Sequence, residues 1–360
     1  MPRNISYITR FSSLFFLVVI LLVFFSCTPD HLQSTFDTAG PVAKSQLTLF
    51  YWIFWAAVVV FVVVVGALLY TIARYRRKPG DSDPEQTHGH TLIEILWTII
   101  PAVVLVVVAV PTVITIFDNA NSPLTTEQGG MTVEVVANQW WWKFTYLNDP
   151  ANPDDDLVTS NELHIPVGEV VNIRLDSRDV LHSFWIPKLA GKVDIIPNQR
   201  NTMWIQADKE GVYLGQCAEF CGVAHALMRF VVVAESEKEF NDWMVSQLTP
   251  GSVPVEPLAL EGMELFESSD AQCWSCHKVR GSKKSRGTKG PDLTHLASRT
   301  HIAAGITENT QENLRAWLHD ADSIKPGNLM ATGAAIFIDP DKKLSEKQVD
   351  ALVAYLRNLK

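Results

Sequence analysis

The sequence lacks an excess of basic charge. Its 360 residues contain 30 Lys and Arg against 39 Asp and Glu, for a formal net charge of −9. Proteins that bind nucleic acid draw much of their affinity from basic side chains facing phosphate, so we exclude nucleic acid as a partner. The chain also shows no internal repeat, and its length predicts more than one domain.

Cysteine is scarce. The five cysteines are Cys27, Cys217, Cys221, Cys273 and Cys276, and the last four form two closely spaced pairs. With so few thiols, each cysteine needs its own explanation.

Apolar residues are concentrated in three early runs. The first lies within residues 1–27, after Arg3 and Arg10, and ends at Ser26 and Cys27. A basic start, a short apolar run and a small residue before a break are typical of a signal peptide. Cys27 resembles the lipid-attachment site of bacterial lipoprotein signals. The alternative is an uncleaved anchor helix, or a cysteine placed there by chance.

Two further apolar runs, residues 47–75 and 92–117, are long enough to cross a bilayer, for which about 20 residues suffice. The first ends in a basic cluster, residues 74–78, and basic clusters favour the cytoplasmic side. The second has no comparable cluster after it and returns the chain to the outside. We predict a transmembrane helix hairpin over residues 45–120, with the rest of the chain extracytoplasmic.

Glu94 lies near the cytoplasmic end of the second predicted span. A carboxylate near lipid is costly and marks a candidate functional residue, but one close to a helix end can also reach water. The residue alone leaves both interpretations open.

Residues 128–248 change to a different pattern. Segments such as TVEVVANQWWWKFTY, VVNIRLDS and MRFVVVAE are rich in β-formers and separated by turn residues. This pattern predicts a β-sandwich. A closing helix begins at a capping box formed by Ser236 and Glu239.

A proline-rich segment, residues 249–257, predicts an extended linker. Residues 258–360 are then helical by pattern, with helices around residues 260–266, around 311–319 and after Ser345. Ser345 and Gln348 form a second capping box. We expect a separate all-α domain.

The segment CWSCH contains Cys273, Cys276 and His277. Two thiols at this spacing can each add to a haem vinyl group, and the histidine that follows can bind the iron. Zinc would need a second ligand pair and a thioredoxin-like redox pair would need a βαβ setting, and the sequence offers neither here. We predict one covalently bound haem c.

Several residues could supply the second axial ligand of that haem. Methionine raises the potential of a haem relative to histidine, and Met330 ahead of the last helix is the best candidate. The alternatives are His295, His301, His319 or an open sixth position. The domain resembles a bacterial class I cytochrome c, in which residues 290–293, GPDL, would support the proximal histidine.

The segment QCAEFCGVAHALM combines Cys217 and Cys221 with His225 and Met228. A blue-copper site has one thiolate and holds one ion. Two thiolates can bridge two copper ions, each of which then binds one histidine, and His182 at a predicted strand end is the natural second histidine. A disulfide between the cysteines is the alternative in an oxidising compartment, but the added histidine and methionine favour copper.

The segments LHSFWIPKLAGKVDIIP and CAEFCGVAHALM, together with the helix hairpin, resemble subunit II of haem-copper cytochrome c oxidases over residues 45–247. With the last domain, the chain resembles the fused subunit II of bacterial oxidases that contain cytochrome c. The resemblance implies a multidomain membrane protein with a binuclear copper A centre in a cupredoxin-like β-sandwich. Its implied copper ligands are His182, Cys217, the carbonyl of Glu219, Cys221, His225 and Met228.

The resemblance implies three more roles. The Glu219 side chain would face subunit I and help to bind magnesium there, Trp140 would mediate electron transfer, and Glu94 would lie at the mouth of a proton channel. For Trp140 the alternative is a place in the sandwich core or an interface. Three adjacent tryptophans, residues 140–142, cannot all face inward in one strand.

The resemblance implies a function as well. A soluble or membrane-bound donor such as cytochrome c would reduce haem c, and electrons would pass through copper A to the haem of subunit I, where oxygen is reduced to water with proton translocation. The chain would lie in a bacterial inner membrane, with its copper and haem domains on the periplasmic side. Its partners would be subunit I, the other oxidase subunits, the donor and the lipid bilayer.

Proteins of other classes are the alternatives. A membrane-bound electron-transfer or copper-delivery protein outside an oxidase is one, but copper chaperones with CxxxC lack a counterpart of Met228 and the hairpin with Glu94. A quinol-oxidising relative would have lost the copper ligands, and the copper domain of nitrous oxide reductase is soluble.

The segment KVRGSKKSRGTKG, residues 278–290, is basic. A solvated loop is the simpler interpretation. The sharper one is that Lys283, Lys284 and Arg286 dock an acidic donor, or an acidic face of a neighbouring domain.

Overall fold

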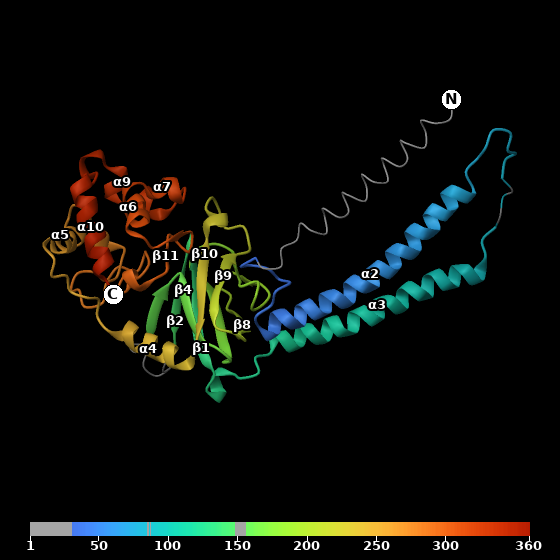
Figure 1. Cartoon of the computed structure of the whole chain (residues 1–360), viewed down its shortest axis with the longest axis horizontal. Helices are drawn as coiled ribbons and strands as arrows, with labels where there is room; N and C mark the ends of the chain where they lie inside the picture. Colours follow the sequence, from blue (N-terminus) through green and yellow to red (C-terminus); the bar gives the residue numbers. More distant parts are fainter. Residues whose placement is uncertain (1–30, 85, 87, 148–155) are drawn as a thin grey trace, which may run out of the picture.

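The computed structural model describes residues 31–84, 86, 88–147 and 156–360. The predicted signal peptide and Cys27 lie outside the described residues. Figure 1 shows a pair of long helices, a β-sandwich and a helical domain, with the sandwich between the other two.

The two long helices are α2 (Pro41–Arg74) and α3 (Thr91–Ala120). Both are long and apolar enough to cross a membrane, and none of their most apolar windows is buried within the protein. Exposed apolar side chains on a fully hydrogen-bonded helix suit a lipid environment. α2 begins earlier than predicted because Pro41 is favourable in a first helical turn and Val42 and Ala43 are buried.

The outer ends of α2 and α3 are fastened to the sandwich. Ser45 Oγ donates to Asn119 Oδ1 at 2.9 Å, which joins the two helices. Trp204 Nε1 of the sandwich donates to the Asn119 carbonyl at 3.0 Å. A Cβ added at Gly40 would lie 2.4 Å from the carbonyl oxygen of Gln206, so only glycine allows this approach.

Two five-stranded sheets form the sandwich. The strands are β1 (Met131–Asn138), β2 (Trp141–Tyr146), β3 (Leu157–Ser160), β4 (Glu162–Pro166), β5 (Val171–Ser177), β6 (His182–Trp185), β7 (Val193–Ile195), β8 (Asn201–Ile205), β9 (Gly211–Cys217) and β10 (Arg229–Glu235). One sheet has the order β3-β2-β1-β5-β8 and the other β4-β10-β9-β6-β7. β1 pairs with β5 and β4 with β10 in parallel, and the other pairs are antiparallel.

Aromatic rings fill the space between the sheets. Phe184 and Phe230 stack with their centroids 4.6 Å apart, and Trp142 packs edge-on against both. A Cβ at Gly215 would lie 2.1 Å from the Phe230 ring, so the glycine makes room for it. These rings lie beneath the ends of β6, β9 and β10 and give them a rigid base.

All three adjacent tryptophans are buried, which the alternation of a strand does not by itself predict. Trp140 and Trp141 are each 9% exposed and Trp142 is fully buried. β2 begins at Trp141, so Trp140 lies before the strand, and the alternation of side chains between the two faces of the sheet does not apply to it. Trp141 and Trp142 point to opposite faces, so both faces of β2 are covered here.

A buried histidine ties the sandwich to helix α4 (Glu237–Leu248), which begins at the predicted capping box. The His164 ring stacks on Trp243 at 4.1 Å and lies 2.6 Å from Glu235 Oε1 and 3.1 Å from Glu162 Oε1. Burial favours the neutral ring, but the hydrogen bonds to both carboxylates outweigh it, so the pKa of His164 is raised.

The last domain consists mainly of helices. They are α5 (Pro257–Phe266), α6 (Gln311–His319), α7 (Ala321–Ile324), α8 (Leu329–Gly333), α9 (Ala335–Ile338) and α10 (Glu346–Asn358), with a short hairpin of β11 (His301–Ile302) and β12 (Thr307–Glu308). α5 begins three residues earlier than predicted, at Pro257, because proline suits the first helical position. α5 packs on α10 so closely that a Cβ at Gly262 would lie 1.9 Å from the Ala351 carbonyl oxygen.

Candidate functional site

Neighbouring strand ends bring the predicted copper ligands together. Cys217 ends β9, and its amide donates to the Met228 carbonyl at 2.9 Å, which closes the base of the loop between β9 and β10. His225 lies in a short 3-10 helix of that loop. β6 pairs with β9, so His182 at the start of β6 reaches the loop from 35 residues away.

One sulfur lies between an imidazole and a carbonyl. Cys217 Sγ lies 3.8 Å from His182 Nδ1 and 3.2 Å from the Glu219 carbonyl oxygen. It lies 3.8 Å from Cys221 Sγ. Both cysteines are free.

The other sulfur has a matching pair of neighbours. Cys221 Sγ lies 3.6 Å from His225 Nδ1 and 3.8 Å from Met228 Sδ. Each sulfur therefore has one imidazole and one weaker donor beside it, and the two halves of the site are alike.

The spacing of the two sulfurs fits a shared metal. At 3.8 Å they are too far apart for a disulfide, whose S–S bond is about 2.0 Å. They are close enough to bind one ion together, because a metal–thiolate bond is about 2.3 Å long. Thiolates, imidazoles and a thioether are ligands that copper accepts.

The two thiols also influence each other's protonation. Because the two thiols share a hydrogen bond, the pKa of Cys217 is lowered and that of Cys221 is raised. The site therefore holds one thiolate readily, which is the form that binds metal.

Asp179 is a functional candidate that we missed in the sequence. Its Oδ1 lies 2.8 Å from His182 Nε2, and its Oδ2 accepts from the amide of Gln139 at 2.7 Å. The carboxylate fixes the imidazole so that Nδ1 faces Cys217. The available signal was its position, three residues before the histidine in SRDVLH.

Trp140 touches the loop directly. Its Nε1 donates to the Cys221 carbonyl at 3.0 Å, and Gln139 Nε2 donates to the same carbonyl at 2.7 Å. The indole is thus hydrogen-bonded to the backbone of a predicted copper ligand.

The CWSCH segment has the geometry of a haem attachment site. His277 Nδ1 is held by the Pro291 carbonyl at 2.8 Å, which leaves Nε2 free to bind iron. Burial lowers the pKa of His277, so the ring stays neutral, as a metal ligand must be. A Cβ at Gly290 would lie 2.7 Å from this ring, so the predicted GPDL support lies where expected.

Met330 and the alternative histidines lie in different surroundings. Met330 in α8 packs against the same apolar core as Cys273. His319 is on the surface and pairs with a carboxylate of α10. His295 is bound to a carbonyl of the linker segment, and His301 lies 3.0 Å from the neighbouring threonine hydroxyl.

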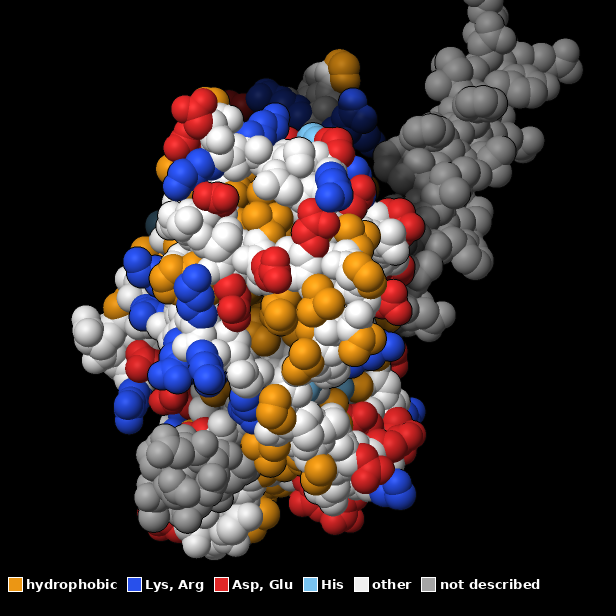
Figure 2. All heavy atoms as spheres, turned by 90° about the vertical axis from the view of Figure 1, so that its left-hand side faces the viewer, with side chains coloured by type: hydrophobic (Ala, Val, Ile, Leu, Met, Phe, Trp, Pro, Cys, Tyr) orange, Lys and Arg blue, Asp and Glu red, His pale blue; other side chains and the backbone are white. Residues whose placement is uncertain are grey.

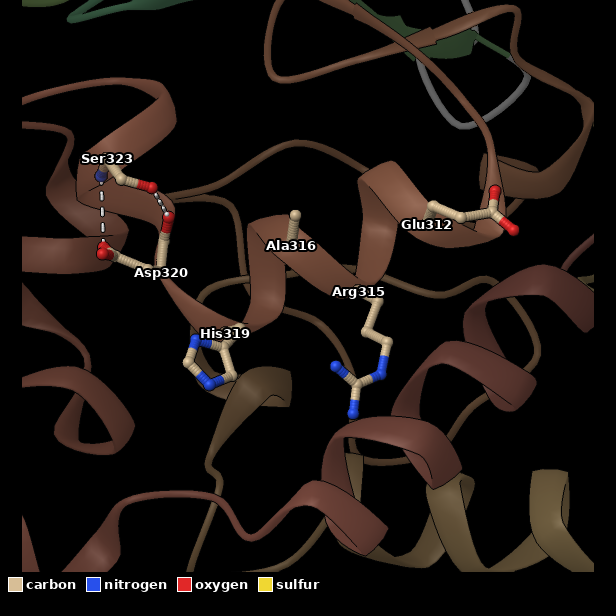
Figure 3. Close-up of a pocket in the computed structure, with 6 residues that line it drawn as sticks. All are labelled: Glu312, Arg315, Ala316, His319, Asp320 and Ser323. Atoms are coloured by element: carbon tan, nitrogen blue, oxygen red, sulfur yellow. Dashed lines mark hydrogen bonds between the residues drawn. The ribbon is translucent and has the colours of Figure 1, made fainter.

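A pocket on α6 and α7 offers no comparable chemistry. Figure 3 shows the residues that line it, which are Glu312, Arg315, Ala316, His319, Asp320 and Ser323. Arg315 Nε donates to Asp350 Oδ1 at 2.8 Å, and its guanidinium also binds Glu346. Its charge is already paired within the domain, so we assign no site there.

Glu94 lies in the first turn of α3. A Cβ at Gly89 would lie 1.9 Å from Glu94 Oε1, so the carboxylate folds back over the turn before the helix. It lies at the same end of the hairpin as the basic C-terminus of α2 (Figure 1).

All three parts of the chain match known families. Residues 29–114 match the transmembrane domain of cytochrome c oxidase subunit II, residues 131–235 match its periplasmic domain, and residues 259–360 match cytochrome c. Over 356 residues the chain is 39% identical to cytochrome c oxidase subunit 2 of Alkalihalophilus pseudofirmus, covering 98% of this chain and 97% of that protein. The chain belongs to the cytochrome c oxidase subunit II family.

Two more proteins are similar to this chain. Cytochrome c oxidase subunit 2 of Bacillus subtilis is 36% identical over 359 residues, with 96% of each chain covered. Quinol oxidase subunit 2 of the same species is 32% identical over 234 residues, covering 63% of this chain and 70% of that protein.

The predicted resemblance and fold class are confirmed. The chain is subunit II of a haem-copper terminal oxidase, with two transmembrane helices, a periplasmic β-sandwich and a fused cytochrome c domain. It transfers electrons toward subunit I, and its family implies copper A and haem c as cofactors. The copper-delivery and soluble alternatives are wrong.

Proposed function

We propose which residues of this subunit II carry its electron path. The copper A ligands are His182, Cys217, the carbonyl of Glu219, Cys221, His225 and Met228. The observation that carries this is the pair of unbonded sulfurs 3.8 Å apart, each beside one imidazole nitrogen. When bound, the copper pair supplies reversible one-electron chemistry. The chain's part is to hold the donors rigidly, on strand ends packed over an aromatic core.

Cys273 and Cys276 attach haem c, and His277 and Met330 are its axial ligands. The fixed ring of His277 and the half-buried Met330 support this assignment. Haem c, when bound, carries one electron at a time. The Pro291 carbonyl orients the proximal imidazole.

Trp140 is hydrogen-bonded to the copper loop and to the cytochrome domain. Its indole binds the Cys221 carbonyl, and its own carbonyl accepts a hydrogen bond from the cytochrome domain. We assign it the role of mediating transfer into the copper site.

The subunit spans a bacterial inner membrane, with the basic end of α2 and the nearby Glu94 on the cytoplasmic side. Glu94 then lies where protons enter a channel of the oxidase. Glu219 contributes its exposed carboxylate to a magnesium site shared with subunit I. In the chain itself, Lys192 Nζ lies 2.9 Å from Asp194 Oδ1 and 3.5 Å from the Glu219 carboxylate, so the two carboxylates share its charge.

Acidic groups of the electron donor bind the basic segment, residues 278–290. Lys284 is bound to the Glu267 carbonyl and lies over Trp274, so it is engaged within the domain. Lys283 and Arg286 are exposed and remain for a partner. Figure 2 shows the face of the cytochrome domain, where basic side chains gather along one side of an apolar band.

Metal analysis and electron paramagnetic resonance of the purified oxidase test the ligand assignment. We expect two coppers and one haem c in this subunit, with a hyperfine pattern from one electron shared by two copper nuclei. His225→Ala and Met228→Leu should alter that pattern and stop turnover while haem c stays reducible. A single copper in the site, or a Cys217–Cys221 disulfide in the active protein, would contradict the proposal.

A further inference from the structure

The cytochrome domain is bonded to the sandwich at several points. The amide of Arg229 donates to the Ala304 carbonyl at 3.2 Å, next to the copper loop. The amide of Asp292 donates to Ser160 Oγ at 3.2 Å, and Arg178 donates to the Thr288 carbonyl at 3.0 Å. In Figure 1 the hairpin strand β11 lies beside β4 and β10.

One buried lysine lies within this contact. Lys325 follows α7 and is 3% exposed. Its Nζ donates to the Trp140 carbonyl and to the Ala303 carbonyl, the latter at 3.4 Å. Burial lowers its pKa to about 7. A buried ammonium group bound to carbonyls instead of a carboxylate is costly, and the function described so far does not use it.

The loop that accepts these bonds has an unusual backbone. Ala303 and Ala304 have φ values of 54° and 66°, in the left-handed region that alanine avoids. The Ala304 carbonyl accepts from the Arg229 amide across the domain contact, and the Ala303 carbonyl accepts from Lys325 within the cytochrome domain. The conformation thus serves the docked arrangement of the two domains.

Lys325 is also linked to the segment that carries Met330. Asn328 Nδ2 donates to the Lys325 carbonyl at 2.7 Å, and Asn328 Oδ1 accepts from the amide of Ala331 in α8 at 2.9 Å. Gly327, between them, packs beside Trp140, with its added Cβ 3.9 Å from the indole. Residues 325–331 therefore form one short unit that touches Trp140 at one end and holds Met330 at the other.

We propose that Lys325 is a positioning residue that clamps the cytochrome domain onto the copper loop and so keeps the Met330 segment against Trp140. Only the kinetic test of this inference depends on the proposed copper and haem ligands. In the clamped state Trp140 is covered, so an outside donor must deliver its electron to the cytochrome domain.

The test compares the oxidase containing Lys325→Met with wild type and with Lys343→Met, which removes an exposed lysine of the same domain. The first readout is hydrogen exchange at the Arg229 amide, which needs no metal. The second is the rate at which photoreduced haem c is reoxidised as copper A is reduced.

In K325M we expect exchange at Arg229 to rise and the transfer rate to fall, each about tenfold or more, because an ammonium–carbonyl bond is lost. Haem and copper spectra should stay unchanged, and transfer should become dependent on solvent viscosity, since the domain must dock again before each event. K343M should match wild type.

A wild-type transfer rate in K325M, whatever its exchange, would overturn the proposal. If K325M does not assemble, Lys325→Gln is the second variant. Glutamine is uncharged and one bond shorter than lysine, so it cannot restore the bond to the Trp140 carbonyl in full, and its rate should lie between wild type and the loss expected for methionine. A wild-type rate in K325Q would also overturn the proposal. Missing copper signals in the wild-type protein would instead count against the ligand assignment, which the exchange measurement does not use.

Discussion

Replacing Asp179 should weaken copper binding in a graded way. The Asp179 carboxylate holds Nε2 of His182 at 2.8 Å, and His182 is fully buried, so water cannot replace the lost partner. Partners of this kind typically change metal affinity about 10- to 100-fold, or about 1.4 to 2.7 kcal/mol.

Two variants of Asp179 should lose copper affinity by different amounts within that range. Asp179→Asn keeps one oxygen that can accept from the imidazole but loses the charge and the second acceptor, which binds the Gln139 amide, so we expect a loss of about tenfold. Asp179→Ala removes the acceptor and frees the Gln139 amide as well, so we expect about 100-fold. Haem c should be unaffected in both.

Competition with a copper chelator, read by electron paramagnetic resonance on the purified oxidase, measures these losses. Asp176→Asn is the matched control, because Asp176 lies three residues earlier, in β5, and accepts from the adjacent Ser177 amide. Wild-type copper affinity in Asp179→Ala would refute the reasoning, since the imidazole would then need no orienting partner.

Three further predictions concern the other parts of the chain. Gly262→Ala should lower the free energy of unfolding of the cytochrome domain by about 1 to 3 kcal/mol, seen as a lower melting temperature of the haem absorption, whereas Gly333→Ala, with open space around it, should be nearly neutral. The raised pKa of His164 stabilises the sandwich fully below about pH 6.5, and this contribution is lost as pH rises through the folded pKa. Denaturant unfolding should therefore show a larger fall in stability from pH 6.5 upward in wild type than in His164→Gln, and equal profiles would contradict the account. Replacing Lys283 and Arg286 by glutamine should slow reduction of haem c by an acidic donor at low salt and flatten the salt dependence, and unchanged stopped-flow rates would exclude this docking surface.

The copper loop could be predicted because its donors lie within one short segment. Cys217, Cys221, His225 and Met228 need only the turn between two paired strands to meet. His182 comes from a strand that is distant in sequence, and it was predicted as the second histidine from its place at a strand end; the family resemblance implies the same residue. Asp179 could have been found too, since a ligand histidine generally has a carboxylate partner.

The domain contact could not be predicted in the same way. Lys325 is buried against Trp140 of the other domain, so its burial depends on how two separately folded units meet. Periodicity within either unit carries no information about that contact. Hydrophobic alternation describes one sheet and its own core. The same limit explains why the sequence left open whether Trp140 is covered, whereas in the structure it is 9% exposed.

Gly40 and Asn119 contact the sandwich directly, and these contacts fix the position of the copper loop relative to the bilayer. A domain hung from a flexible tether would sample many heights and tilts before meeting subunit I. Here the copper loop has a fixed distance from the membrane and a fixed orientation, so it is already positioned when the subunit meets subunit I. Adding a few flexible residues just after Gly40 would remove that fixed orientation and leave every metal ligand unchanged.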